Sequence, residues 1–453
     1  MTDQSLSAVI LAAGLGTRMR SRTPKVLHPI AGRPMIDYVI QAVEEAGIKR
    51  IAVVLNPQQP EVAEHIHGRC EVVYQEVQKG TGHALAQAPP DLLGQGDVLV
   101  VNCDQPLLRP ETLRHLVAAH RGSGAAATLA TVHDPEREDG RVLRTGSGGF
   151  ERIVEAADAG LEVKAVGEIN VGLYCFKGGS ELMRALTALA PNNRSRELYI
   201  TRLFDQLRPV EIVLLEDPVE AIGINDRVQL ARAEAAIRKR VLERLMRSGV
   251  TVADPAATYV DAGVEIGEDT VLEPMTIVRG RSRIGRDCRI GPYAEIYDSV
   301  IGDGVRIERS WLRECRVADG SDCGPFSKLR PGTELGVRVH VGSFAEIVRS
   351  RIGPGTAVPH LAYLGDAVVG ENVNIGAGTI TANYDGAAKN PTEIGDGAFI
   401  GVDTMLRAPV KVGKKSKTGA GAVVTRDVPD GATVVGVPAR VVRRESQTGG
   451  RSR

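Results

Sequence analysis

An aliphatic residue followed by glycine recurs through the C-terminal part of the chain, mostly at intervals of six residues or multiples of six. The pairs are Ile266-Gly267, Ile284-Gly285, Ile290-Gly291, Val369-Gly370, Ile375-Gly376, Ile394-Gly395, Ile400-Gly401 and Val412-Gly413. A period of six suits a three-sided solenoid of about 18 residues per turn, in which each aliphatic side chain points inward and stacks on its neighbours. Glycines at the corners explain why the chain contains 51 of them.

The repeat is out of phase at one place. The interval from Ile375 to Ile394 is one position longer than three repeats. We expect an extra loop within residues 383–391 to absorb this slip. A loop that projects from a regular scaffold is a common place for function.

The first 225 or so residues follow a different pattern, in which strand-like and helix-like segments alternate. This alternation predicts an α/β domain with a mostly parallel sheet covered by helices on both faces. Ligands of such sheets bind at the carboxyl ends of the strands. The predicted strands are residues 7–12, 51–56, 70–74, 98–102, 126–131, 172–176 and 210–215, and the predicted helices include 35–46, 82–88 and 109–121.

A single amphipathic helix is predicted between the two regions. Asn225 or Asp226 can cap its start, and Gly249 can end it. We therefore predict an N-terminal domain over residues 1–226, a linker helix over 227–248, a solenoid domain over 249–438, and a basic, disordered tail over 439–453.

Composition narrows the class of protein. Lys+Arg and Asp+Glu both number 56, so no global charge favours nucleic acid or acidic lipid as a partner. The six cysteines form no CxxC pair, which argues against a zinc or redox motif and favours reduced thiols. No apolar run reaches membrane-spanning length. We expect a cytoplasmic protein that binds neither membrane nor nucleic acid.

The N-terminal segment Val9 to Pro29 runs from an apolar strand into a glycine-containing turn and then into basic residues. Gly14 and Gly16 allow backbone N–H groups to approach a phosphate, and Arg18 and Lys25 add positive charge. The segment is neither a GxxxxGK loop nor a complete GxGxxG fingerprint. On spacing alone, an ordinary strand-to-helix turn is the alternative.

The longer segment LAAGLGTRMRSRTPKVLHPIAGRPM resembles the signature of sugar-1-phosphate nucleotidyltransferases, most closely the bacterial bifunctional family that makes UDP-N-acetylglucosamine. The resemblance extends from Val9 to about Val435. It implies a Rossmann-like mixed-sheet uridylyltransferase domain, a linker helix and a left-handed β-helix acetyltransferase domain that assembles as a homotrimer. Acetyl-CoA would acetylate glucosamine 1-phosphate, and UTP would then react with N-acetylglucosamine 1-phosphate to release pyrophosphate.

In the first domain, the resemblance implies a nucleotide site, a sugar site and a Mg²⁺ site. Asp104 and Asn225 would bind the metal, and Lys25 would also neutralise triphosphate charge. Asp104 could instead only start a turn, and Asn225 could only cap the helix. The residues implied to bind UTP and UDP-N-acetylglucosamine are Leu11, Ala12, Ala13, Gly14, Lys25, Gln75, Gly80, Thr81, Gly140, Glu155, Asn170 and Asn225.

In the second domain, the resemblance implies that His360 is the general base for acetyl transfer. A neutral imidazole suits that role near pH 7, although a lone histidine is often only a solvated corner residue. Arg330, Tyr363 and Asn374 would bind the glucosamine phosphate. The residues implied to lie along acetyl-CoA are Ala377, Asn383, Tyr384 and Ala420.

The sequence departs from the family pattern at five positions, which leaves two alternatives open. Cys103 replaces a glycine before the metal aspartate; in the second domain the departures are Val348 for lysine, Pro359 for glycine, Val402 for serine and Val437 for arginine. Arg349 could compensate for Val348. One alternative is a single-activity nucleotidyltransferase with a structural or regulatory β-helix. A non-catalytic assembly protein is disfavoured because Lys25, Asp104 and Asn225 are present.

Overall fold

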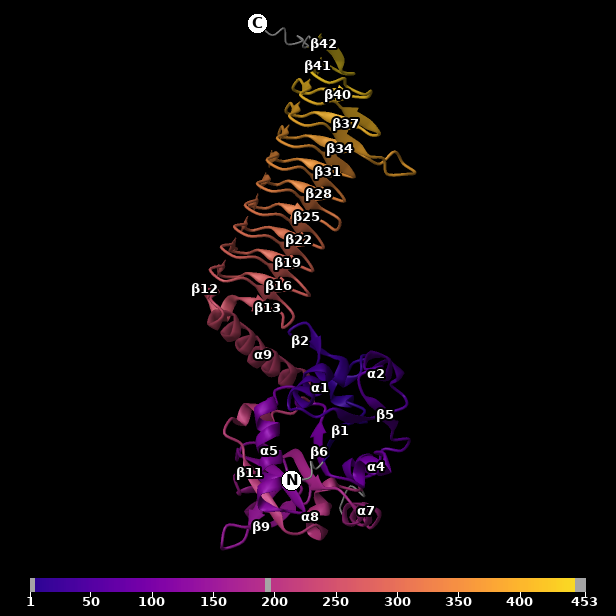
Figure 1. The fold of residues 1–453 in the computed structure, drawn as a ribbon, viewed down its shortest axis with the longest axis vertical. Coiled ribbons are helices and arrows are strands. Elements are labelled where there is room, and N and C mark those ends of the chain that lie inside the picture. Colours follow the sequence, from indigo (N-terminus) through magenta and orange to yellow (C-terminus); the bar gives the residue numbers. More distant parts are fainter. Residues whose placement is uncertain (1–4, 192–196, 445–453) are drawn as a thin grey trace. The chain divides into compact units, whose positions relative to one another are not determined.

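The structure is a computed structural model that describes residues 5–191 and 197–444. It divides into two compact units, one up to Ile237 and one from Arg238 onward (Figure 1). No helix in these described ranges combines the length and the apolar character needed to span a bilayer.

The first unit is built on one mixed sheet. The sheet order is β11 (Val210–Leu214), β7 (Ala127–His133), β10 (Glu168–Lys177), β6 (Asp97–Asn102), β1 (Leu6–Ala12), β4 (Arg50–Leu55) and β5 (Glu71–Tyr74). Strand β10 runs antiparallel to β6 and β7, and the other neighbours in this order are parallel. The predicted α/β mixed sheet is therefore confirmed. Central strands such as β1 are buried on both faces, and so they are almost continuously apolar.

Helices cover both faces of this sheet and form two separate cores. One core joins the sheet to α1 (Met35–Glu45), α2 (Pro60–His65) and α5 (Pro110–Ser123). The other joins it to α3 (Thr81–Leu85), α4 (Pro90–Leu93), α7 (Ser180–Thr187) and α8 (Leu203–Gln206), and it contains the packed rings of Phe150, Tyr174, Phe176 and Phe204. The short helix α6 (Leu161–Lys164) has no buried residue.

A hairpin that the sequence did not predict lies beside β10. It consists of β8 (Arg141–Arg144) and β9 (Phe150–Val154), which pair antiparallel, and β8 also pairs with β10 at Ile169. Its strands are short and partly exposed, and so they lack the apolar run that marked the other strands.

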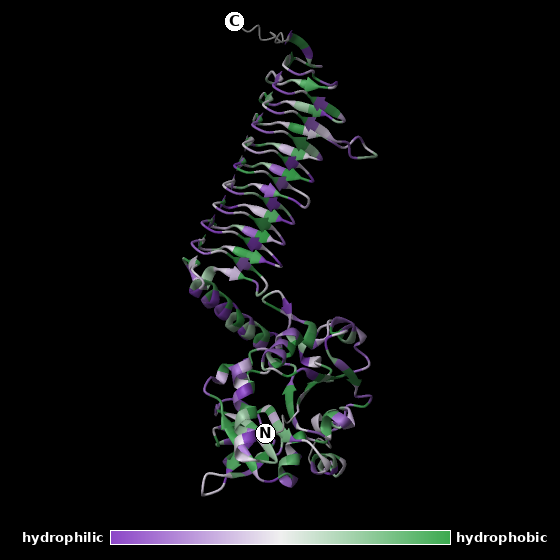
Figure 2. Ribbon diagram, in the orientation of Figure 1, coloured by the Kyte–Doolittle hydropathy of each residue, from purple (hydrophilic) through white to green (hydrophobic). Residues whose placement is uncertain are grey.

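The predicted linker helix is α9 (Arg227–Arg247). Asp226 caps its start, because the Gln229 backbone N–H donates to Asp226 Oδ1 at 2.8 Å. The Gln229 side chain in turn accepts from the Asn225 backbone N–H at 2.6 Å. The Asn225 side chain is thus not the cap. Most of α9 carries hydrophilic colours in Figure 2, and its apolar residues Ile237, Val241 and Leu245 are buried.

The second unit is a parallel β-helix with three sheets of stacked short strands. The first sheet runs from β12 (Thr251–Val252) to β42 (Arg440–Arg444), the second from β13 (Tyr259–Val260) to β40 (Val423–Val424), and the third from β14 (Glu265–Ile266) to β38 (Val410–Val412). Aliphatic residues from all three sheets, such as Ile284, Ile290 and Ile296, fill the interior. The predicted solenoid is confirmed.

Several turns are shorter than three full repeats. Arg289 pairs with Arg306, one position short of the predicted turn length, and Arg306 pairs with Asp322, two positions short. Many corners contain a non-glycine residue with a left-handed backbone, as Asp298 does with a φ of 45°. The six-residue period therefore predicts where the strands lie more accurately than it predicts the lengths of the corners between them.

The predicted loop is present between β34 (Ile380–Ala382) and β35 (Thr392–Ile394), and it projects from the stack in Figure 1. Ile380 pairs with Met405 on the next turn, so the turn that contains the loop is longer than its neighbours. Asp385 holds the loop: its carboxylate accepts from the backbone N–H groups of Ala387 and Ala388 and from Asn390. These hydrogen bonds lower the pKa of Asp385 to about 2.

The end of the β-helix corrects one prediction. Residues 440–444, assigned from sequence to a disordered tail, form strand β42, which pairs antiparallel with β41 (Ala432–Val435). The basic side chains do not prevent this pairing, because the strands pair through their backbone groups. Residues 445–453 of the predicted tail lie outside the described residues.

Candidate active sites

A pocket of about 320 Å³ opens in the first unit at the carboxyl ends of β1 and β6. Parallel strands of such sheets direct ligands to this edge. The pocket brings together nine of the predicted residues: Leu11, Ala12, Ala13, Gly14, Lys25, Gln75, Gly80, Thr81 and Asp104. The sequence analysis did not single out Leu15, Gln78 or Asn102, which also line the pocket.

The loop after β1 is shaped by its two glycines. A Cβ on Gly14 would meet nothing within 4 Å, which leaves the backbone open to a ligand. Gly16 has a φ of 62°, and a Cβ there would lie 2.7 Å from Lys25 Cβ. Gly16 thus lets the loop close over the lysine and brings Lys25 to the pocket wall.

Lys25 lies between the two predicted metal ligands. Its Nζ is 2.6 Å from Asp104 Oδ2 and 3.3 Å from Asn225 Oδ1, and the Lys25 side chain is largely buried. The two oxygens therefore converge on one cationic group. A carboxylate and an amide oxygen also suit Mg²⁺, which commonly takes one or two protein ligands and completes its shell with water and substrate phosphates. Within the described residues, no cluster of three or more His, Cys, Asp or Glu side chains offers a fuller metal cage.

Gln75 is buried in the pocket wall with its amide held by two neighbours. Its Nε2 donates to the Gly80 carbonyl at 3.1 Å and lies 2.9 Å from His83 Nδ1. Burial lowers the pKa of His83, which favours a neutral ring beside the amide. Because a carbonyl can only accept, Gln75 must present its N–H₂ to Gly80 and direct its oxygen elsewhere.

Three further predicted residues form a separate cluster near the β8–β9 hairpin. The Asn170 backbone N–H donates to the Gly140 carbonyl at 2.8 Å, and a Cβ on Gly140 would lie 3.4 Å from Glu155 Oε2. Burial raises the pKa of Glu155, and Thr201 donates a hydrogen bond to its carboxylate. Asn170 donates to the Tyr174 hydroxyl at 2.7 Å. Sequence reasoning missed Tyr174, which supports Asn170 from the same strand, and Thr201, which supports Glu155 from a distant segment.

In the second unit, His360 lies at one corner of the β-helix. It ends β30 (Ala357–His360), is exposed, and pairs in register with Ser343 of β27 (His340–Ser343). Ala377, Val402 and Ala420 follow at the same corner, where Asp403 N–H donates to the Ala377 carbonyl and Gly421 N–H to the Val402 carbonyl. Ala377 and Ala420 carry only methyl groups, and the Val402 side chain between them is half exposed.

The predicted phosphate-binding residues lie on the next sheet. Arg330 donates to Glu346 Oε1 at 2.8 Å, and Glu346 pairs in register with Tyr363 of β31 (Tyr363–Gly365). Asn374 begins β33 (Asn374–Ile375) and pairs with Ala357. Arg330 and Tyr363 are half-buried, as is Asn374. Arg330 and Tyr363 thus lie two turns apart, with Glu346 on the turn between them.

Val348 and Arg349 differ in what they can offer a ligand. Val348 ends β28 (Glu346–Val348) and is 2% exposed, so its position is part of the core. Arg349 has a left-handed backbone and forms a bidentate ion pair with Asp366 at 2.7 and 2.9 Å. This pairing raises the pKa of Arg349.

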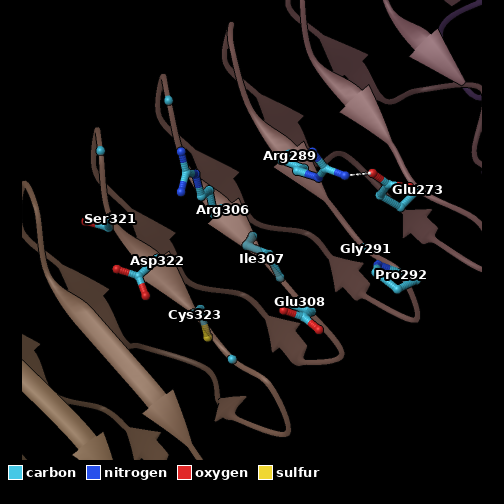
Figure 3. Close-up of a pocket in the computed structure, with 13 residues that line it drawn as sticks. Glu273, Arg289, Gly291, Pro292, Arg306, Ile307, Glu308, Ser321, Asp322 and Cys323 are labelled. Carbon is cyan, nitrogen blue, oxygen red and sulfur yellow. Dashed lines mark ion pairs between the residues drawn. The ribbon is translucent and has the colours of Figure 1, made fainter. Parts of the chain in front are cut away.

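A larger groove of about 720 Å³ lies elsewhere on the β-helix (Figure 3). It crosses β18 (Arg289–Ile290), β21 (Arg306–Ile307) and β24 (Asp322–Cys323), and contains an ion pair between Arg289 and Glu273 at 2.6 Å. None of the residues predicted to act on a substrate lines it. Size alone therefore does not mark the site in this unit.

Comparison with known proteins identifies the family. Residues 8–220 match the MobA-like NTP transferase domain, residues 263–298 match the bacterial transferase hexapeptide repeats, and residues 391–426 match the hexapeptide repeat of succinyl-transferase. The bifunctional protein GlmU of Syntrophomonas wolfei is 47% identical over 94% of this chain and 96% of its own length.

The chain belongs to the bifunctional GlmU family. Two further GlmU proteins agree: that of Pelotomaculum thermopropionicum is 50% identical over 90% of both chains, and that of Carboxydothermus hydrogenoformans is 45% identical over 95% of this chain and 97% of its own. Like its GlmU relatives, the chain is a bifunctional transferase, with a nucleotidyltransferase domain and a left-handed β-helix of hexapeptide repeats.

Proposed function

We propose that the chain makes UDP-N-acetylglucosamine in two steps on its two units. The β-helix transfers the acetyl group of acetyl-CoA to the amine of glucosamine 1-phosphate. The first unit then transfers the uridylyl group of UTP to N-acetylglucosamine 1-phosphate and releases pyrophosphate. The observation that supports this proposal most strongly is the convergence of Lys25, Asp104 and Asn225 in one unit, together with His360 on a ligand-accessible corner in the other.

In uridylyl transfer, a sugar phosphate oxygen attacks the α-phosphorus of UTP in line, and the P–O bond to pyrophosphate breaks. Positioning and charge neutralisation account for most of the catalysis of such reactions. Lys25 neutralises the phosphate charge, and the backbone at Gly14 leaves room for the phosphates. Asp104 and Asn225 would hold Mg²⁺, which when bound supplies further positive charge to the phosphates.

The pocket selects the base, and the neighbouring cluster at the β8–β9 hairpin selects the sugar. Gln75 directs its amide oxygen away from the Gly80 carbonyl, and that oxygen fits the N–H donor on the pairing edge of uracil. Gly80 and Thr81 line the pocket next to it. Glu155, Asn170 and Gly140, which lie together near the β8–β9 hairpin, contact the sugar.

In acetyl transfer, His360 removes a proton from the amine of glucosamine 1-phosphate as the nitrogen attacks the thioester carbonyl. The C–S bond then breaks, and the sulfur takes up the proton held by His360, so that CoA leaves as the thiol. Arg330 and Tyr363 bind the phosphate, and Asn374 contacts the sugar. The donor lies along Ala377, Asn383, Tyr384 and Ala420. Val348 is part of the core, so the phosphate must be bound without a cation at that position.

Separate assays of the two steps test the proposal. We expect the purified protein to release thiol from acetyl-CoA with glucosamine 1-phosphate, and pyrophosphate from UTP with N-acetylglucosamine 1-phosphate. A chelator should abolish pyrophosphate release and leave thiol release unchanged, because Asp104 and Asn225 belong only to the first site. Pyrophosphate release without any thiol release would instead support the single-activity alternative.

We also propose that the chain assembles as a homotrimer through one corner of the β-helix. Met275, Tyr293, Phe326, Phe344 and Leu361 follow one another there in successive turns, with Arg309 on the turn between Tyr293 and Phe326. Each has a left-handed backbone, which bulky residues rarely adopt. Phe344 and Leu361 are 59% and 62% exposed in the single chain. Such an apolar ridge is typical of an interface, and it ends beside His360.

Loss of this ridge should dissociate the assembly. Phe326 and Phe344 stack with ring centroids 5.3 Å apart, so Phe344→Ser removes a central contact. We expect the mass measured by light scattering to fall from three chains to one, and acetyl transfer to fall with it. Val368→Ser, which removes an exposed apolar side chain from another sheet, should leave the mass unchanged. An unchanged mass for Phe344→Ser would contradict the proposed interface.

A cytoplasmic location is also part of the proposal. All six cysteines are free, and five of them are buried. Free thiols in this number are typical of a reducing compartment.

A further inference from the structure

A chain of hydrogen bonds crosses three turns of the β-helix where the projecting loop begins. Arg349 and Asp366 occupy the same corner of successive turns, with left-handed φ angles of 44° and 52°. Asn383, the first residue of the loop, lies at that corner on the turn after Asp366. Arg349 donates to both carboxylate oxygens of Asp366, and Asn383 Nδ2 donates to Asp366 Oδ2 at 2.5 Å.

Asp366 determines which way the Asn383 amide faces. A carboxylate can only accept hydrogen bonds, and so Asn383 must present its N–H₂ to Asp366. Asn383 is 6% exposed, which leaves its side chain little freedom to turn. No hydrogen bond from the described part of the chain reaches its Oδ1. The amide oxygen is therefore left as an acceptor for a ligand.

Gly365 brings this amide next to Tyr363. A Cβ on Gly365 would lie 2.6 Å from Asn383 Nδ2 and 2.7 Å from the Tyr363 hydroxyl. Only a residue without a side chain allows both groups to meet at this point. The Arg349–Asp366 pair thus lies where the proposed subsites for the sugar phosphate and the acyl donor adjoin.

The Arg349–Asp366 ion pair is better suited to orienting the Asn383 amide than to stabilising the fold. The Arg349 and Asp366 side chains are 38% and 20% exposed, and exposed ion pairs contribute little to folding. The Arg349 hydrogen bonds lower the pKa of Asp366, and Asn383 and the nearby Lys389 act in the same direction. With its guanidinium paired in this way, Arg349 does not replace the lysine that is absent at Val348.

We propose that Arg349 and Asp366 are positioning residues for acetyl transfer, an inference that rests on the proposed function. Asp366 turns the Asn383 amide so that Oδ1 accepts a hydrogen bond from an amide N–H of the acyl donor's pantetheine arm. Arg349 holds Asp366 in place through both of its carboxylate oxygens. Neither residue reacts with the substrate.

Asp366→Asn tests this role with almost no change in volume. An asparagine at 366 can donate as well as accept, so the Asn383 amide is free to turn its oxygen inward. We expect KM for acetyl-CoA to rise about tenfold, the effect of one lost hydrogen bond, while KM for glucosamine 1-phosphate stays the same. Arg349→Gln should raise KM for acetyl-CoA by a smaller factor, and Arg349→Lys should restore most of the loss.

Arg351→Gln is the matched control. Arg351 belongs to β29 (Arg351–Ile352) and forms an exposed inter-turn ion pair with Glu334 at 3.2 Å, away from the loop. Its variant should keep the parental KM values. An Asp366→Asn protein with the same KM for acetyl-CoA as Arg351→Gln would overturn the inference. So would a loss of thermal stability that raised both KM values together.

Calorimetric titration with CoA separates this inference from the proposed function. About tenfold weaker CoA binding by Asp366→Asn than by the parent would support the positioning role, even if neither protein transferred an acetyl group. In that case only the proposed reaction would have failed. Equal CoA affinities would overturn the positioning role whatever the activity.

Discussion

His360→Ala should abolish acetyl transfer and leave uridylyl transfer intact. Proton transfer by a positioned side chain contributes about 10² to 10⁴-fold to a rate, and we expect a loss of that size in thiol release. Stability should not change, because His360 is exposed and makes no hydrogen bond to another described residue. Thiol release and pyrophosphate release from the same preparation provide the measurement.

A second histidine of the same sheet offers the control. His340 is exposed, belongs to β27 and pairs with Asp322 at 2.6 Å, some distance along the chain from the proposed site. His340→Ala should release thiol at the parental rate. If His360→Ala kept more than about a tenth of that rate, far above what loss of a general base allows, His360 would not be the base.

Asp104→Asn should have a comparably large effect on the other reaction. The substitution removes the charge that holds Lys25 at 2.6 Å and that would hold Mg²⁺, while it keeps the shape of the side chain. Loss of one such electrostatic contact commonly lowers a rate by about 10² to 10³-fold. We expect pyrophosphate release to fall by that factor and to need more Mg²⁺ for half-maximal rate.

Asp91→Asn is suited as its control, because Asp91 forms an exposed ion pair with Arg50 at 2.5 Å in the same unit. This variant should keep the parental rate and the parental dependence on Mg²⁺. An Asp104→Asn enzyme whose Mg²⁺ dependence matched that of Asp91→Asn would show that Asp104 does not bind the metal.

Most of the fold could be predicted from the sequence, because the residue patterns that indicate it are local and repeated. The six-residue period and the single slip after Ile375 predicted both the β-helix and its loop. The apolar strand before Gly14 likewise predicted β1 and the pocket edge. From the sequence, Asn225 could be either a helix cap or a metal ligand. The hydrogen bond from the Gln229 backbone N–H to Asp226 shows that Asp226 is the cap.

The features that escaped prediction depend on contacts between distant segments. Strand pairing sets the antiparallel direction of β10 and the β8–β9 hairpin. The hydrophobic period of a single strand does not indicate its partner or its direction. The Arg349–Asp366 pair arises because both residues take left-handed corners that sequence rules reserve mainly for glycine.

The hairpin of β41 and β42 has a consequence for how the molecule behaves in solution. A stack of parallel strands ends in a row of unpaired backbone groups, which can recruit another chain and grow into a fibre. Strand β42 reverses direction and pairs with that row in the first sheet, and its Arg440 and Arg443 are exposed. Like charges repel an incoming edge, so the hairpin ends the first sheet and protects that sheet against end-to-end pairing.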